Sequence, residues 1–545
     1  MKKLLPILMA AAAELLMAQA VFEPSHSSIY EFLNRLSIKG ILEINDELKP
    51  LTRAELAEKL SEAEAHLKNL TYLEKEELAY FKKEFSPEIL HNSERDFEPE
   101  TQFFTSTDSN GFRFFLFHND NFTLNLDPIL GAEIKSKFNE VQYHRWNGLQ
   151  LYGYYNKNLG FDFYFRDNEE RGNWIDRAKA MSNEPGVNLS NNFEKTIEYV
   201  DVQGLISYSW NSGNISIGKQ PIEWGSGLGG KIIFSNKPPS FPFIKLEFKP
   251  VDWLKFIYFH GWLHSGIADS SSIRSTQVEK RNSVSQIEKF IAAHMFSIYP
   301  TENLSISLGE SMVYSDKLEF AYFIPILFFR TVDHYLAKDK VNSGDNAQLF
   351  LNSVYKNHDL KTKFYATVFI DELSITKLLD GDNLSALGFT TGLSMVEPVF
   401  ENSDISIEYT RLNPFVYMNS NDAQTFRSHN YQLGHWIGSN AHQIYFEYNH
   451  SLLRGLRFKL WSEFIRKGKL ELPEEQYEFP YPQFLYGEKL SIFNLGITAK
   501  YEFMHNLFGV LSLTHSSISD ESTLRTPDYQ LGSKQSFSFS FSYGF

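Results

Sequence analysis

The chain of 545 residues contains no cysteine. This absence excludes a disulfide framework, a thiolate metal site and a cysteine nucleophile. Beyond residue 20 the sequence also lacks any apolar run of about 18 residues, the length that a membrane-spanning helix requires. The best stretch, Phe320–Phe329, is only ten residues long and is interrupted by Pro325. A membrane-spanning helix after residue 20 is therefore excluded.

Positive charge is in deficit, with 52 Lys and Arg against 67 Asp and Glu and a formal net charge of −15. An acidic chain of this kind is a poor partner for nucleic acid. The sequence has no P-loop, no His-Glu-x-x-His zinc motif and no Gly-x-Ser-x-Gly nucleophile elbow. Asp345, Asp371 and Glu372 offer oxygen ligands for Ca²⁺, but their spacing differs from an EF-hand loop and solvated strand ends explain them better. We therefore predict no nucleic-acid partner, cofactor, metal site or enzymatic activity.

Residues 1–20 have the three parts of a secretory signal peptide. Lys2 and Lys3 form a charged start, residues 4–17 are largely apolar, and Ala18-Gln-Ala20 is a small-x-small cleavage site. A short N-terminal helix is the alternative interpretation. No cysteine follows the cleavage site, which excludes a lipid-anchored N-terminus. We predict an exported protein.

Residues 21–96 have helical periodicity. Three Ser/Thr-x-x-Glu capping boxes begin at Ser28, Thr52 and Thr71, and each lets two side chains satisfy free backbone N–H groups. Gly40 is predicted to end the first helix and Ser86-Pro87 the third. We therefore expect a bundle of three helices.

Part of this helical segment also resembles a single S-layer-homology repeat. The residues concerned are Ile38–Ile41 and Pro50–Glu55. The resemblance implies contact with cell-wall polymer such as peptidoglycan, while helix capping explains the same residues without a partner.

Residues 97–545 read as short alternating strands separated by turn residues. The last strand is the clearest. Phe537, Phe539, Phe541, Tyr543 and Phe545 alternate with Ser and Gly, so one face is aromatic and the other is small and polar. Apolar-out, polar-in alternation suits a barrel with lipid outside and water inside. A soluble β-protein with the aromatic face on a core is the alternative.

The length of this region sets the strand number. At about 10 residues a strand plus turns and loops, it accommodates about 16–20 antiparallel strands. Mixed stretches at 167–195, 262–285 and 467–488 are predicted to be long loops.

Several motifs in this order resemble the Wzi-type capsule assembly family of bacterial outer-membrane proteins. They are Gly218–Gly227, Ile233–Pro242, Asp333-His334, Gly344–Asn346, Asp371-Glu372, Glu408–Arg411 and Leu433–Gly438, preceded by Ile29–Arg35 and Leu51–Arg53. The resemblance covers nearly the whole mature chain. It implies an 18-stranded outer-membrane barrel with a helical bundle at its periplasmic end. It also implies binding and organisation of capsular polysaccharide at the cell surface.

Glu223 and Trp224 are the first candidate binding residues. A Trp face can stack on a sugar ring while a carboxylate accepts from its hydroxyl groups. The alternative is an inward-folded plug loop in which Trp224 is a structural anchor.

Asp333, His334, Arg411, His435 and Trp436 are the remaining candidates. Asp333-His334 has the composition of a general-base pair, but adjacent residues on a strand point to opposite faces. A polar network in the barrel wall, with Arg330 or Arg411, is therefore the preferred interpretation, and His435-Trp436 has the same two readings.

We predict a non-catalytic protein that binds capsular or other surface polysaccharide and helps to assemble or retain it. Its expected partners are that polysaccharide, outer-membrane lipid and, through the helical segment, peptidoglycan or a periplasmic protein. The first rival is a porin or transporter, which an open lumen would favour and a filled lumen would not. The second is a hydrolase, which requires a Ser or water close to His334 or His435.

Overall fold

The computed structural model describes residues 20–91, 99–107, 111–137, 140–156, 158–277, 282–336, 344–372, 386–470, 472–477, 480–522 and 525–544. The predicted signal peptide, except Ala20, lies outside these residues. So do residues 92–96 of the predicted helical segment, and Phe545.

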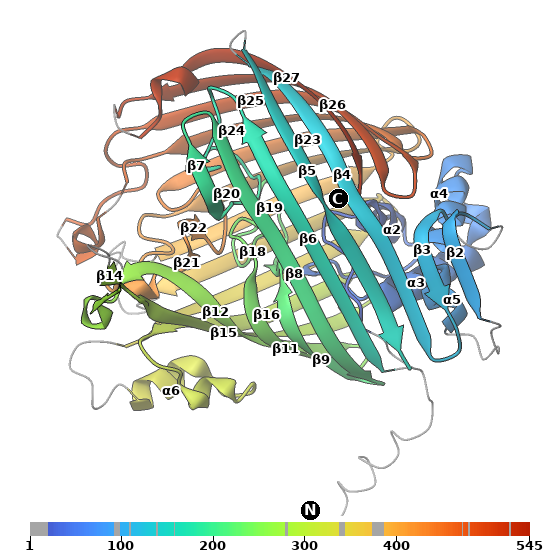
Figure 1. Ribbon diagram of the computed structural model, residues 1–545, viewed down its shortest axis with the longest axis horizontal. Coiled ribbons are helices and arrows are strands. Elements are labelled where there is room, and N and C mark those ends of the chain that lie inside the picture. Colours follow the sequence, from blue (N-terminus) through green and yellow to red (C-terminus); the bar gives the residue numbers. More distant parts are fainter. Residues whose placement is uncertain are drawn as a thin grey trace, which may run out of the picture.

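The wall of the molecule is a closed antiparallel barrel of 18 strands (Figure 1). Pairing of β27 with β4, from Ser536↔Lys137 to Tyr543↔Leu130, closes the ring. The predicted fold class and strand number are confirmed. The wall strands are β4 (Phe122–Lys137), β5 (Glu140–Tyr155), β6 (Leu159–Arg171), β8 (Thr196–Trp210), β9 (Gly213–Gln220), β11 (Phe241–Val251), β12 (Leu254–Ala268), β15 (Gln286–Thr301), β16 (Leu304–Ser315), β17 (Asn346–Asn357), β18 (Thr362–Glu372), β19 (Ala386–Val396), β20 (Ser403–Leu412), β23 (Ala441–Leu453), β24 (Leu456–Lys467), β25 (Leu490–Met504), β26 (Leu507–Asp520) and β27 (Gly532–Tyr543).

Side-chain alternation decides which face of the wall is outside. Phe537, Phe539 and Phe541 of β27 are 41–48% exposed on the outer face. Their cross-strand partners include Leu511, Leu513 and Ile134, so neighbouring strands continue the same apolar band. The alternating serines face the interior, as the polar-in pattern predicts.

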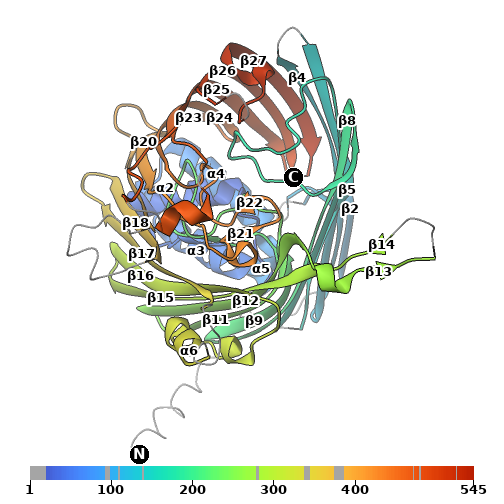
Figure 2. The same cartoon turned by 90° about the vertical axis from the view of Figure 1, so that its left-hand side faces the viewer.

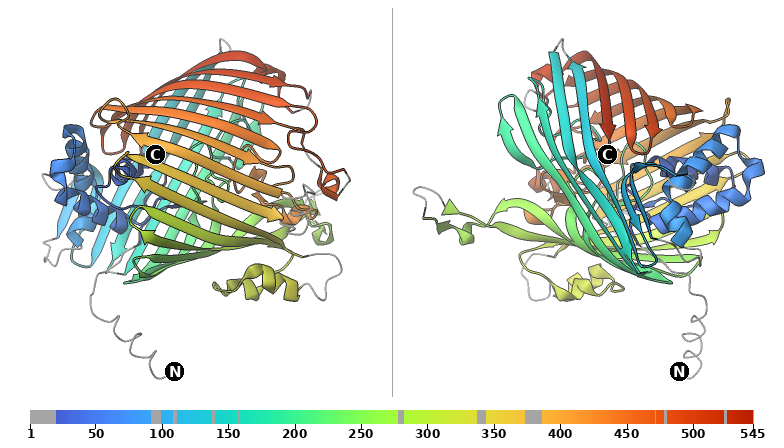
Figure 3. Two further views of the ribbon diagram at one scale, coloured as in Figure 1. Left: turned by 180° about the vertical axis from the view of Figure 1, so that it is seen from behind. Right: turned by 45° about the vertical axis from the view of Figure 1, so that its right-hand side comes forward.

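The two ends of the barrel differ in the length of their connections (Figure 3). At one end the strands are joined by short turns, such as 211–212 between β8 and β9 and 454–455 between β23 and β24. At the other end most connections are long, such as 172–195, 316–345 and 413–440. We call these the short-turn end and the long-loop end.

Short strands and helices decorate the wall. The hairpin β2 (Glu100–Thr105) and β3 (Arg113–His118) pairs with the first part of β4, below the point where β27 ends. In the long loops, β7 (Leu189–Phe193) pairs with β8, β13 (Arg274–Ser275) with β14 (Asn282–Ser283), and β21 (Arg427–Ser428) with β22 (Tyr431–Gln432). One loop also contains η3 (Phe320–Phe323) and α6 (Phe329–Leu336).

The N-terminal segment contains the three predicted helices and a fourth. They are α2 (Ser28–Ile38), α3 (Arg53–Ala65), α4 (Tyr72–Glu84) and α5 (Ser86–His91), with a short turn η1 (Leu67–Asn69). Ser86 and Pro87 do follow the third helix, but they also begin α5, because proline is tolerated in a first helical turn.

The three predicted capping boxes have different outcomes. Thr71 and Glu74 form a complete box, and Thr52 accepts from the Glu55 N–H. The box predicted at Ser28 is wrong: Ser28 is already helical, and the N-cap residue Ser27 makes no side-chain cap hydrogen bond. Burial of the apolar faces against one another stabilises this segment more than capping does.

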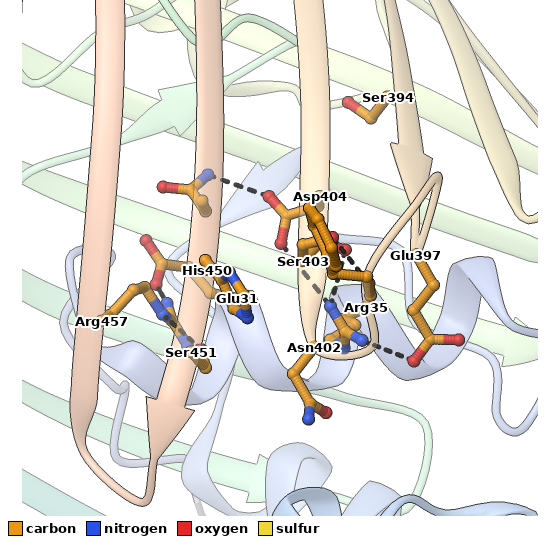
Figure 4. Close-up of polar contacts among 12 residues, drawn as sticks. Glu31, Arg35, Ser394, Glu397, Asn402, Ser403, Asp404, His450, Ser451 and Arg457 are labelled. Atoms are coloured by element: carbon orange, nitrogen blue, oxygen red, sulfur yellow. Dashed lines mark hydrogen bonds and ion pairs between the residues drawn. The ribbon is translucent and has the colours of Figure 1, made fainter.

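These helices close the short-turn end of the barrel (Figures 1 and 2). Arg35 of α2 lies beside the β19–β20 turn, where its guanidinium is 2.6 Å from Glu397 and donates to the Ser403 carbonyl (Figure 4). Arg457, on β24, pairs with Glu31 on the same helix. These contacts fix the helices to the wall. Of the described helices, none is long and apolar enough to cross a membrane.

Inside the barrel, next to the helices, the loops 221–240 and 413–440 fill part of the lumen, and we call them the plug. The loop 221–240 folds inward, and its short strand β10 (Glu223–Trp224) pairs with β1 (Leu48–Lys49) of the N-terminal segment. Together with loop 413–440 it forms an apolar core against the inner faces of the strands that follow. Ala20, Phe22 and Leu48 of the N-terminal segment therefore share a core with the loops and the wall, while the helices have a core of their own.

Candidate functional site

A cavity of about 670 Å³ lies inside the barrel between the plug and strands β4–β9. This volume falls within the ordinary range of ligand sites. One side of the cavity is the inner face of the wall. The other is formed by residues 21–26, by Pro221 and 238–240 of the inward loop, and by residues 184–188 of the β6–β8 loop.

The wall side is aromatic and polar. Alternation along β5, β6 and β8 points one residue in two at the cavity, and cross-strand pairing sets them in rows. Gln150, Tyr164 and Gln203 form one such row. The inward-facing residues that line the cavity on these strands are Gln142, His144, Gln150, Tyr152, Asp162, Tyr164, Arg166, Glu170, Tyr199, Asp201 and Gln203.

A hydrogen-bonded cluster fixes the upper part of this face. The Tyr199 hydroxyl donates to Glu170 Oε1 at 2.9 Å, and Lys179 Nζ donates to the same oxygen at 2.7 Å. His144 Nε2 lies 3.1 Å from Asn168 Oδ1. These contacts join strands β5, β6 and β8 to the long loop, so the side chains are held in place before a ligand arrives.

Other polar atoms on the same face are buried without a protein partner. They include Gln150 Oε1, Asp162 Oδ2, Arg166 Nε and Gln220 Oε1. Buried polar groups ordinarily find a partner, because an unmade hydrogen bond leaves the cost of desolvation uncompensated. These acceptors and this donor can pair with a hydroxyl-rich molecule or with water.

The rim of the cavity is held by Lys237 of the inward loop. Its ammonium donates to the carbonyls of Ser182 and Glu184, at 2.9 and 2.7 Å, and to that of Lys179. Burial lowers the pKa of Lys237 to about 8. The Lys237 side chain and the Tyr431 hydroxyl, which is hydrogen-bonded to Val187, thus fix to the plug the loop that overhangs the cavity.

Glu223 and Trp224 lie in the plug, away from the cavity. Trp224 is 1% exposed and packs edge-on against Phe234 and Phe259, with ring centroids 5.2 and 5.1 Å away. Its faces are covered, so the burial favours the anchor interpretation over sugar stacking. Glu223 lies 3.3 Å from Lys231 and accepts from Ser25. Although burial raises the pKa of Glu223, Lys231 outweighs that effect and the pKa is lowered.

His435 and Trp436 belong to the same plug. Trp436 Nε1 donates to the Gly229 carbonyl at 2.8 Å, which ties loop 413–440 to loop 221–240. His435 is fully buried, and burial lowers its pKa to about 3, so its imidazole is neutral. Its Nδ1 accepts from the Ile437 N–H. In the described structure these two residues join the plug loops.

Asp333, His334 and Arg411 occupy other places. The assumption that Asp333 and His334 lie on a strand is wrong, because both are on α6, where Asp333 Oδ1 accepts from the Asp345 N–H. His334 is exposed. Arg411 lies on β20, and its guanidinium is over the Phe484 ring, 3.9 Å from the ring centroid. The structure does not bring the three together.

Asp371 is a correction of a different kind. We predicted a solvated strand end, but Asp371 is 7% exposed and accepts from the Tyr417 N–H at 2.5 Å. Its carboxylate therefore holds a plug loop. Among the residues that the structure describes, no group of three or more His, Asp or Glu is arranged to hold a metal ion.

Sequence reasoning missed the cavity residues. Tyr164, Arg166 and Tyr199 belong to no motif, and they become neighbours only through the pairing of β6 with β8. One signal was available: the Phe161–Phe165 alternation continues into charged and polar inward positions, followed by a predicted long loop. A strand whose inner face is rich in Tyr, Arg and Asp marks a hydrated lumen.

Comparison with known proteins agrees with this architecture. Residues 168–478, more than half of the chain, match the family described as capsule assembly protein Wzi. No curated protein matches the sequence.

Among solved structures, Wzi of Escherichia coli has 12% identity, a TM-score of 0.55, and coverage of 96% of this chain and 100% of its own. That protein is described as a carbohydrate-binding outer-membrane β-barrel involved in group 1 capsule assembly. OccAB2 of Acinetobacter baumannii has 10% identity, a TM-score of 0.40, and coverage of 77% and 98%. OprD of Pseudomonas aeruginosa has 13% identity, a TM-score of 0.40, and coverage of 77% and 94%. The chain belongs to the Wzi capsule assembly family of bacterial outer-membrane β-barrel proteins.

Proposed function

We propose that this protein binds capsular or other surface polysaccharide in the lumenal cavity and helps to assemble or retain the polymer at the cell surface, without catalysing a reaction. The observation that carries the proposal is the inner face of β5, β6 and β8, where tyrosine rings stand beside amide, carboxylate and guanidinium groups that each keep a buried polar atom without a protein partner. Membership of the family and the carbohydrate binding of the Escherichia coli protein support it.

The chemistry of the cavity suits a sugar. The ring face of Tyr164 can pack on sugar C–H groups, and its phenol oxygen gives it a polar edge. Asp162 and Gln150 can accept from hydroxyl groups while Arg166 donates. A polymer that presents many equivalent sugars rebinds after each release, so contacts that are weak singly retain it.

The orientation follows from loop length. Long loops of such barrels face outward and short turns face the periplasm. We propose that the helices α2–α5 are periplasmic and that the cavity, beneath the 172–195 loop, serves the cell surface.

The plug disfavours a porin. Trp224, Phe234 and Phe259 lie in one core inside the barrel, and the helices close the short-turn end. A solute crossing the lumen would have to displace the helices, even on the side where the plug leaves a cavity. A hydrolase is also disfavoured, because His435 is buried in the plug and His334 lies on α6, away from the cavity lining.

Substitution of Arg166 tests the proposal. Removing a charged hydrogen-bonding group costs about 1.5–3 kcal/mol, so Arg166→Ala should weaken glycan binding roughly 10- to 100-fold. Purified variants in detergent would be titrated with capsular polysaccharide from the producing strain, and retained capsule would be measured on cells. The matched control is Arg145→Ala on the adjacent strand, whose side chain is 73% exposed on the outer face.

The result expected is loss for Arg166→Ala and none for Arg145→Ala. Equal binding by both variants and the unaltered protein would refute a glycan site in the cavity. Equal loss in both would show that the effect is general and does not come from the lumen.

We also propose that peptidoglycan or a periplasmic protein contacts the tip of α3 and η1. Residues 64–69 of this tip are exposed and point away from the helical core. Cross-linking from a single cysteine at Glu64 (E64C) would test this, with Asp252→Cys in a short turn as the control. Identical cross-linking patterns at the two positions would count against a dedicated partner.

A further inference from the structure

Residues 318–336 of the β16–β17 loop fold back over the outside of the barrel (Figures 1 and 2). This segment, which we call the outer flap, contains η3 and α6. It packs on the outward faces of β12, β15 and β16, where Tyr258, Met312 and Tyr314 are buried beneath it. The flap therefore lies outside the barrel, whereas the plug and the cavity lie inside it.

Among the apolar residues of the wall beneath the outer flap are three polar side chains. His260, His294 and Glu310 point outward, and cross-strand pairing sets His294 directly opposite Glu310. A face of a barrel that meets lipid should be apolar, because lipid offers no partner for such groups. All three side chains are nevertheless buried.

The flap supplies the partners that lipid would not. The Phe329 N–H donates to Glu310 Oε1 at 2.5 Å, and His294 Nε2 lies 3.3 Å from the same oxygen. The Phe323 ring stacks on His260 with centroids 4.1 Å apart. The flap therefore covers each of the three polar residues.

The opposite surface of the flap exposes a group of apolar residues over 320–328, while Arg330, Thr331 and His334 of α6 are exposed farther along the chain. Phe320 is 77% exposed, Ile326 75%, and Phe328 50%. Leu308 of the wall, two residues along β16 from Glu310, is 60% exposed on the same outward face. Residues two apart on a strand are about 7 Å apart, so the flap lies directly beside the lipid-facing band.

We infer that the outer flap is embedded in the outer membrane and that its exposed apolar residues bind the acyl chains of the leaflet on the long-loop side. The flap thus covers three polar residues of the wall and presents apolar residues in their place. Lipid is the occupant because the surface continues the apolar band of an outer-membrane barrel. An apolar patch of this kind facing water would be an aggregation hazard.

The absence of cysteine makes a clean test possible, since one substitution gives one labelling site. Ile326→Cys would carry a small environment-sensitive fluorophore in the full-length protein, reconstituted into phosphatidylcholine vesicles with bromine on the acyl chains. Leu513→Cys, on the lipid-facing wall, is the positive reference. Asp252→Cys, in a fully exposed short turn, is the negative reference.

The expected result is quenching at Ile326→Cys close to that at Leu513→Cys, and several-fold greater than at Asp252→Cys. Quenching equal to that at Asp252→Cys, together with reaction of Ile326→Cys with a water-soluble thiol reagent, would overturn the inference. Protection from both bromine and reagent, with a dimer by light scattering, would also overturn it, because a second copy would then cover the flap.

Discussion

The two halves of the barrel interior differ in how they are filled. On strands β11–β18 the inward residues include an apolar cluster, among them Phe259, Ile291 and Phe350, which packs against the plug. On strands β5–β9 the inward residues are polar or aromatic, such as Tyr164 and Arg166, and a cavity remains. The same closed wall thus encloses a dry core on one side and a ligand-sized space on the other.

The difference shows what decides whether a lumen is filled. Apolar inward side chains gain free energy when loops cover them, so the loops 221–240 and 413–440 gather on that side. Polar inward side chains gain little from such cover, because each would need a new hydrogen-bond partner. The half that the plug leaves uncovered is therefore the half available to a hydrophilic ligand.

The largest effect is expected from Trp224→Ala in the packed half. Loss of a buried Trp costs about 3–5 kcal/mol, since a cavity remains beside Phe234 and Phe259. We expect hydrogen exchange of residues 221–240 to accelerate and ion conductance to appear in planar bilayers. The control is Trp253→Ala, whose residue is 58% exposed in a short turn. Unchanged exchange in Trp224→Ala would show that the plug does not depend on this core.

A smaller, pH-dependent effect on stability is expected at the short-turn end of the barrel, where the helices dock. Ion pairs attach α4 to the wall there. Glu84 of α4 pairs with Arg113 at 2.8 Å and with His505 in the β25–β26 turn. Burial lowers the pKa of His505, but Glu84 outweighs it and raises that pKa to about 9. For Glu84, burial raises the pKa, but Arg113 and His505 outweigh it and lower that pKa to about 2.

The sign of the pH dependence follows from the raised pKa. Stabilisation by His505 is complete below its unfolded pKa of about 6.5 and is lost as pH rises through about 9. The loss is on the order of 3 kcal/mol for the docking of α4. Proteolysis of the helical segment should accelerate between pH 7 and pH 10 in the unaltered protein, and much less in His505→Gln. The same acceleration in both would assign it to another group.

The smallest effect on stability is expected when a substitution fills the cavity. Gln203→Trp on β8 places a large ring in the cavity, where there is space for it without steric clash. The free energy of unfolding should therefore change by about 0.5 kcal/mol or less. Glycan binding should fall sharply in the same titration. The control is Val202→Trp, one residue along and on the outer face. Binding unchanged in Gln203→Trp would place the glycan elsewhere.

The candidate site shows that a distinctive sequence motif does not by itself identify a ligand site. Glu223-Trp224 and His435-Trp436 are the most distinctive stretches of the sequence, and the structure places them in the plug. Distinctive residues at close spacing indicate a constrained local fold, which a structural anchor needs as much as a ligand site does. Tyr164 and Arg166 belong only to a general strand alternation, and strand register alone brings Tyr199 to the same face.

The sequence by itself determined the class of the molecule. The alternation of Phe and Ser in β27, the absence of a spanning apolar run and the helical periodicity of the first segment are local properties, and local periodicity fixes strand, helix and which face meets lipid. Tertiary structure alone decided which half of the lumen is filled and where α6 lies. Those outcomes depend on contacts between residues more than a hundred positions apart, such as Leu48 with Trp224, and no short stretch encodes the register that creates them.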